Sequence, residues 1–142
     1  MRYIEETDLA SVIQERFLDD STANIAGDQT ILNDIENKAI AYAVSFISTR
    51  YNTDLIFSET EPLRSPILQQ IIAQIMVYRA VKRNAARKVP EDYVTMFNEA
   101  TRMLERIQSG AMKLVGMPVL TDESGNNTPL MWGNTTNSNY FI

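Results

Sequence analysis

The sequence predicts an all-α protein: a small helical bundle with one short N-terminal helix, three longer helices and an extended C-terminal tail. Two observations predict this class. In three separate stretches, apolar residues recur every three or four positions, the spacing that keeps one face of a helix against a core. The ends of these stretches carry the Ser, Pro, acidic and Gly residues that favour helix starts and stops. The 142 residues, 44% of them hydrophobic, are enough for one domain with its own core.

Residues 65–88 carry the most complete helix signature. Ser65 is a preferred N-cap residue, and Pro66 takes the first helical position, where its missing N–H costs nothing. One face is apolar and is formed by Ile67, Leu68, Ile71, Ile72, Ile75, Met76 and Tyr78. Arg79, Lys82 and Arg83 then fall within the same arc. Because isolated cations are almost never fully buried, we expect the last turns to leave the core, or to meet acids from the chain or from a partner.

Two helices are expected before this one. Thr7 would cap a short helix with Leu9, Val12 and Ile13 on its apolar side. Turn-forming residues over 17–29 predict a loop, and its acids lack the alternating ligands of a calcium-binding EF-hand. Thr30 or Asp28 would then cap a long helix that runs to Tyr51. The apolar face of that helix is expected to contain Ile31, Ile35, Ala39, Tyr42, Phe46 and Ile47.

One long helix is expected after it. Residues 52–63 suit a connector held to the core by Leu55, Ile56 and Phe57. Pro90 at the first helical position and Gly110 after the last one delimit the final helix. Its apolar residues are Tyr93, Met96, Phe97, Ala100, Met103, Leu104 and Ile107. Because the link around Val89 is short, the last two helices should form an antiparallel hairpin.

The pattern divides the chain into a helical domain, residues 1–115, and an extended, poorly ordered tail, residues 116–142. The tail contains no basic residue but carries apolar side chains that a linker does not need, namely Trp132, Tyr140, Phe141 and Ile142. Two interpretations remain open: a mobile terminus, or a segment that docks on a neighbour or partner. Ordering such a segment costs about 1 kcal/mol per residue in backbone entropy, which requires a groove that the core cannot spare. We therefore expect it to cross a neighbouring subunit or a partner.

Charge is distributed unevenly along the chain, whose net charge is −5. Residues 1–63 hold 12 acidic and 4 basic residues, whereas residues 64–113 hold 4 acidic and 9 basic ones. Within one subunit the two halves would neutralise each other by packing; in an assembly, the acidic face of one copy would meet the basic face of the next. The sequence does not separate these two arrangements.

Composition argues against an enzyme. The chain has no Cys and no His, which removes thiolate chemistry and the commonest general base and metal ligand. The nearest acidic pairs, such as Glu91 with Asp92, stand where helix capping or solvation explains them. We therefore expect no catalytic residues, no cofactor and no metal. The acidic N-terminus and the absence of a long apolar run predict a cytoplasmic product without a membrane segment.

The layout of residues 1 to about 115 resembles the small head-tail connector proteins of tailed bacteriophages. The resemblance rests on the helix pattern, on the stretches STRY and YRAVKRN, and on Tyr51, Pro66, Tyr78, Arg79, Tyr93, Leu104, Ile107 and Gly110. It implies a helical adaptor or head-completion protein located in the virion at the head-tail junction. Copies would form a ring, usually dodecameric, that binds the portal protein, extends the DNA channel and offers a docking surface for the tail or tail-completion proteins. It implies nonspecific proximity to DNA, no membrane and no small-molecule substrate.

The candidate interface residues lie in two groups. The basic group comprises Arg79, Lys82, Arg83, Arg87 and Lys88, and the tail group comprises Trp132, Tyr140, Phe141 and Ile142. The rival function is a helical binding module that contacts nucleic acid through the basic group. Against it stand an isoelectric point near 4.7 and the lack of a helix-turn-helix pair or aromatic platform. An ordinary solvated or salt-bridged surface also remains open.

Overall fold

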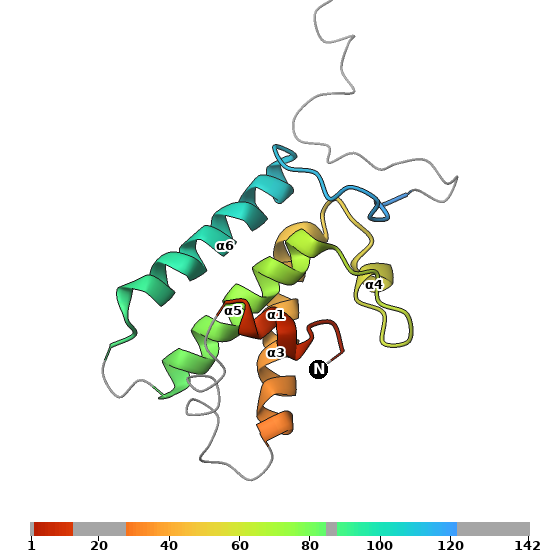
Figure 1. Cartoon of the computed structure of the whole chain (residues 1–142). Helices are drawn as coiled ribbons and strands as arrows, with labels where there is room; N and C mark the ends of the chain where they lie inside the picture. Colours follow the sequence, from red (N-terminus) through yellow and green to blue (C-terminus); the bar gives the residue numbers. More distant parts are fainter. Residues whose placement is uncertain (1, 13–27, 85–87, 122–142) are drawn as a thin grey trace, which may run out of the picture.

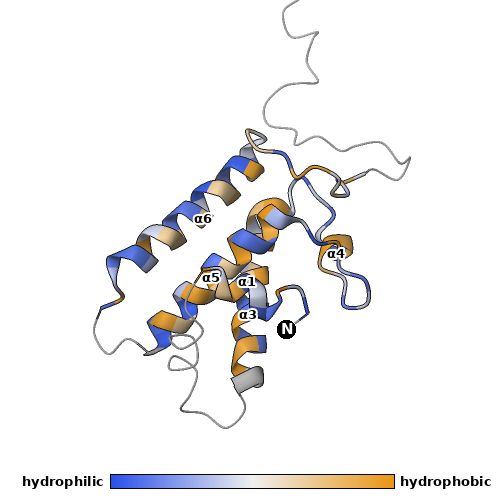
Figure 2. Cartoon of the chain, viewed as in Figure 1, coloured by the Kyte–Doolittle hydropathy of each residue, from blue (hydrophilic) through white to orange (hydrophobic). Residues whose placement is uncertain are grey.

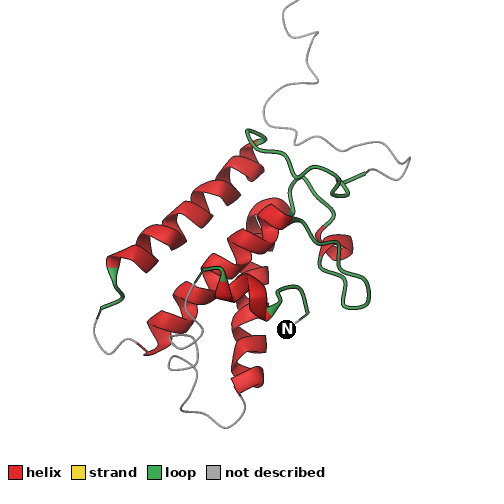
Figure 3. Ribbon diagram, viewed as in Figure 1, coloured by secondary structure: helices red, strands yellow, loops and turns green. Residues whose placement is uncertain are grey.

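The computed structural model describes residues 2–12, 28–84 and 88–121, and within these ranges the regular structure is helical (Figure 3). The helices are α1 (Glu6–Ala10), α3 (Asp28–Ile47), α4 (Thr53–Ile56), α5 (Pro66–Asn84) and α6 (Glu91–Ser109). The predicted all-α class is confirmed. No helix in this part of the chain combines the length and the apolar character needed to cross a membrane.

Helix α5 lies at the centre and contacts α1, α3 and α6 (Figure 1). It begins at Pro66, as expected, and the carbonyl of Ser65 accepts the first helical N–H from Gln69 at 2.8 Å. Its N-terminal two-thirds is buried on nearly every side because three helices cover it. The fully buried residues are Leu68, Ile71, Ile72, Ala73, Ile75, Met76, Val77 and Ala80.

Helices α5 and α6 run antiparallel, which confirms the predicted hairpin (Figure 1). Stacked aromatic rings join them to α3: Phe97 lies 4.4 Å from Tyr78 and 5.7 Å from Tyr42, measured between ring centroids. The Tyr42 hydroxyl also lies 3.1 Å from that of Thr101. Along α6, hydrophilic and hydrophobic residues alternate in bands (Figure 2), as expected for a helix with one buried face.

Several predicted boundaries were wrong by a few residues. Thr7 does not cap α1: the Asp8 side chain accepts the N–H of Glu5 at 2.9 Å, so the helix starts at Glu6. Asp28 and Thr30 both lie inside α3 rather than before it. Pro90 precedes the first helical residue of α6 instead of occupying it, whereas Gly110 ends that helix with φ +86°, as predicted.

Helix α3 ends at Ile47, short of the predicted Tyr51, in a turn where the N–H groups of Arg50 and Tyr51 both bond to the Ile47 carbonyl. The Arg50 guanidinium donates to the carbonyls of Gln108 and Ser109, at 2.7 and 3.1 Å, and so caps the C-terminal end of α6. The connector contains a short helix that the sequence did not predict, α4, whose N-cap Asn52 accepts the Leu55 N–H. Ile56 and Phe57 hold this connector to the core, but Leu55 is 52% exposed, contrary to expectation.

The N-terminal residues are held by one buried carboxylate. Glu36, only 1% exposed, accepts the backbone N–H groups of Arg2, Tyr3 and Ile4 at 2.8 to 2.9 Å. On the other side, the Arg64 guanidinium donates to the carbonyls of Arg2 and Tyr3. These two side chains thus satisfy the N–H groups of residues 2–4 and the carbonyls of Arg2 and Tyr3, and three N–H donors stabilise the buried carboxylate of Glu36.

Residues 112–121 lie along residues 50–52. The Leu114 N–H donates to the Tyr51 hydroxyl at 2.9 Å, and the Asn52 N–H donates to the Pro118 carbonyl at 2.9 Å. An antiparallel bridge links Tyr51 with Val119. The first residues of the segment expected to form the tail, up to Thr121, are therefore joined to the subunit's own body by backbone hydrogen bonds.

Candidate interaction surfaces

A groove lies between the first half of α3 and the end of α5, and we call it the basic groove. Its volume is about 640 Å³. Thr30, Ile31, Asp34, Ile35 and Lys38 line it from α3, and Arg79, Lys82 and Arg83 line it from α5. Among the described residues, four cations thus face one carboxylate, and Lys38 pairs with that carboxylate, Asp34, at 2.6 Å. The groove is suited to an anionic group that also has apolar surface.

Arg79 lies at the boundary between the core and the groove. Its side chain is half-buried, and its guanidinium carbon lies 5.9 Å from the centre of the Tyr42 ring, within cation–π distance. Its Nε atom is buried and has no hydrogen-bond partner among the described residues. Because a buried donor without a partner costs free energy, Arg79 favours an acceptor that enters from outside.

Farther along the basic group, the cations become exposed, as expected from the sequence. Lys82 is exposed and lies 5.8 Å from the Tyr78 ring centre. Arg83 is also exposed, and Lys88 forms a surface pair with Glu91 at 3.7 Å. Arg87 lies outside the described residues. The structure therefore brings Arg79, Lys82 and Arg83 together at one groove, while Lys88 lies in the link before α6.

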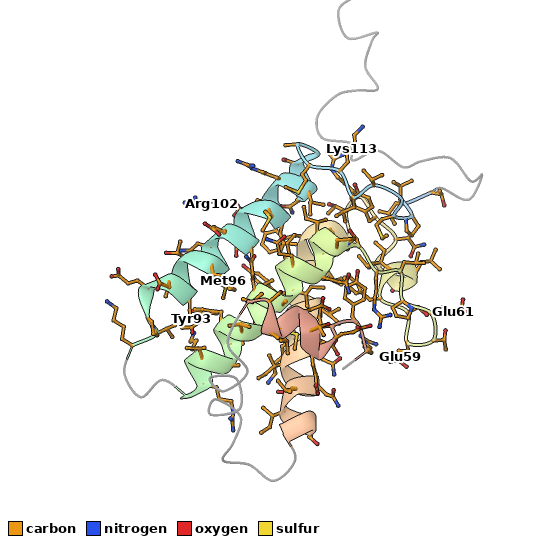
Figure 4. All side chains as sticks on the ribbon, in the orientation of Figure 1. Glu59, Glu61, Tyr93, Met96, Arg102 and Lys113 are labelled. Atoms are coloured by element: carbon orange, nitrogen blue, oxygen red, sulfur yellow. The ribbon has the colours of Figure 1, made fainter. Side chains whose placement is uncertain are left out.

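The sequence did not predict a second charged surface. Residues 54–63, which we call the acidic loop, contain Asp54, Glu59 and Glu61 and no basic residue. Two of its leucines are solvent-exposed, Leu55 at 52% and Leu63 at 41%. Glu59 and Glu61 lie at its outer edge (Figure 4). In the sequence, the close spacing of leucines and acidic residues could have indicated this surface, but residues 52–63 were predicted to be only a connector.

The acidic loop is held at its base. The Leu63 N–H donates to the Ile56 carbonyl at 2.9 Å, and the Ser58 hydroxyl accepts the N–H groups of Thr60 and Glu61. The buried Tyr3 hydroxyl donates to the Leu63 carbonyl and accepts the Ser65 N–H. Burial raises the pKa of Tyr3 above its ordinary value of 10.0, an effect that the Ser65 hydrogen bond and the Arg64 charge partly oppose. Through these hydrogen bonds of the Tyr3 hydroxyl, the N-terminal residues hold the end of the acidic loop.

The tail group, Trp132, Tyr140, Phe141 and Ile142, lies outside the described residues, as do residues 17–27 of the loop predicted over 17–29. In the part of the chain that the structure does describe, no three acidic side chains gather closely enough to hold a metal ion.

The arrangement defines a small helical protein with two charged surfaces of opposite sign. A model of the family described as bacteriophage Mu, Gp36, matches residues 3–130 of the chain. The match covers most of the sequence, and the chain belongs to this bacteriophage family. The comparisons with curated proteins and with solved structures gave no match.

Proposed function

We propose that the chain is a non-catalytic structural protein of the phage virion, a head-tail connector. In this proposal its copies form a ring that binds the portal protein, extends the DNA channel and presents a docking surface for the tail. Two observations together support this proposal most. The chain belongs to a phage family, and its helical body carries both a basic groove and an acidic loop.

A ring requires this kind of surface. Its contacts are heterologous, so one patch on each copy must complement a different patch on the next. The acidic loop lies on one side of the molecule, beside α4, whereas the C-terminal end of α5 lies on the opposite side (Figure 1). One copy therefore presents surfaces of opposite sign in two different directions.

The experiment is a binding assay with the portal protein of the same phage. The two purified proteins are mixed, and the complex is analysed by light scattering and negative-stain electron microscopy. The proposal expects many copies of this chain per portal ring, in a closed layer at one end. If the chain binds no portal and no tail protein, the connector function is refuted.

The rival function rests on the same cations. Contact through Arg79, Lys82 and Arg83 would be nonspecific and would weaken as salt is added, because it would come from counterion release. Weak, salt-sensitive DNA binding is compatible with a channel wall. Tight, sequence-selective binding by the isolated protein at physiological salt would refute the connector and favour the nucleic-acid module.

A further inference from the structure

We propose that the acidic loop of one copy inserts into the basic groove of the next, and that this contact closes the ring. The inference rests on the proposed function and adds which residues join neighbouring copies. Its occupant is a second copy of this chain.

Charge complementarity is the first argument. The acidic loop carries three carboxylates without a basic residue, and the basic groove carries four cations and one carboxylate. Glu59 is 86% exposed, and among the described residues it pairs with Arg2 at 3.3 Å, an exposed contact that costs little to exchange. A loop carboxylate that reaches Arg79 would supply the acceptor that its buried Nε lacks among the described residues.

Apolar complementarity is the second argument. Leu55 and Leu63 leave a large part of their surface in water, and Ile31 and Ile35 line the groove between the cations. A volume of about 640 Å³ falls within the roughly 300–1,000 Å³ typical of binding pockets, so several side chains fit. Contact between leucine and isoleucine side chains would remove apolar area from water, whereas the charges would set the orientation.

Order in the loop is the third argument. Its base is closed by the Ile56 to Leu63 hydrogen bond, and Tyr3 and Ser58 hold its two halves. A loop that is already ordered loses less conformational entropy on binding. The C-terminal end of α5, whose side chains line the groove, lies on a different side of the body from the loop (Figure 1), so the contact can repeat from copy to copy, as a ring requires.

The absence of cysteine makes a cross-linking test direct. Thr60→Cys marks the loop and Thr30→Cys marks the groove; both positions are exposed. A short bis-maleimide is added at high protein concentration, with and without the portal protein. The double variant should give a ladder of covalent oligomers, and a mixture of the two single variants should give dimers of one copy of each. Thr60→Cys combined with Thr95→Cys, on the exposed side of α6, is the matched control and should give no ladder.

Charge exchange then tests the contact itself. Glu59→Arg with Glu61→Arg should lower the ladder by about tenfold. Adding Lys82→Glu and Arg83→Glu to the same chain should restore it, with helicity by circular dichroism unchanged throughout. Restoration supports the contact, and a ladder that loop reversal does not change overturns it.

Three other outcomes overturn the inference as well: no ladder under either condition, cross-links within one chain, or groove reversal that lowers DNA binding while the ladder persists. A portal-bound ring without the cross-link refutes this contact alone. A ladder with no portal binding refutes the connector function while leaving the contact between copies.

Discussion

Replacement of Glu36 by Gln is the sharpest test of how the N-terminal residues are held. The side chain keeps its shape but loses its charge and one of its two acceptor oxygens. In the native protein, Oε1 accepts from Tyr3 and Ile4 and Oε2 accepts from Arg2. In the variant, the amide oxygen still accepts two of these hydrogen bonds, now as a neutral acceptor. The amide NH₂ group faces the third backbone N–H, so that bond is lost.

The expected cost follows from those three bonds. Hydrogen bonds to a charged group contribute about 1.5–3 kcal/mol each, and neutral ones about half as much. Taken at the lower end of these ranges, two weakened bonds and one lost bond destabilise the native state by about 3 kcal/mol. For a chain of this size, that corresponds to a decrease in Tm of about 10 °C.

The assay is thermal and urea unfolding followed by circular dichroism, with amide hydrogen exchange at Tyr3 and Ile4. Exchange at both amides should accelerate before the body unfolds, because the N-terminal residues detach first. Asp34→Asn is the matched control: it removes a carboxylate from the same helix, but from an exposed pair with Lys38, so its cost should stay below about 0.5 kcal/mol. If Glu36→Gln is as mild as this control, the buried carboxylate does not hold the N-terminus.

Three further predictions follow from local geometry and charge. Gly110→Ala should lower the free energy of unfolding by about 1–2 kcal/mol because of the left-handed backbone. It should lower it further because the added Cβ would lie 2.9 Å from the Arg50 guanidinium carbon. Gly116→Ala, at φ +78° with nothing within 4 Å of its Cβ, should show the backbone cost alone in the same urea titration. Because the unfolded state ionises first, the stability that depends on the raised pKa of Tyr3 should be present below pH 10 and decline above it; Tyr3→Phe should remove up to about 1.4 kcal/mol per pH unit of that slope. Equal alkaline slopes would contradict this assignment. Reversal of Arg79, Lys82 and Arg83 to Glu should abolish assembly on portals and preserve helicity, and normal assembly would refute the role of these cations.

Local signals were sufficient for most of the fold. Pro66, Gly110 and the apolar spacing of α5 and α6 predicted these two helices, because capping chemistry and helical periodicity act within a few residues. The short link around Val89 predicted their antiparallel packing. The exposure of Lys82 and Arg83 was also predictable, since charged side chains are almost never fully buried.

The features that the sequence did not predict depend on contacts between residues far apart in the chain. In the sequence, Glu36 has the pattern of an ordinary polar position on a helix, and only the fold brings the N–H groups of residues 2–4 against it. The Arg50 guanidinium caps the end of α6, 58 residues away in sequence, and no local pattern predicts that contact. The acidic loop was missed as a surface because exposure of Leu55 and Leu63 is a tertiary property.

Electron microscopy of this protein bound to the phage portal tests the proposed ring most directly. We predict a closed layer of repeating copies coaxial with the portal, with the acidic loop of each copy against the basic groove of the next. Portals that remain bare at saturating concentrations of this protein would contradict it.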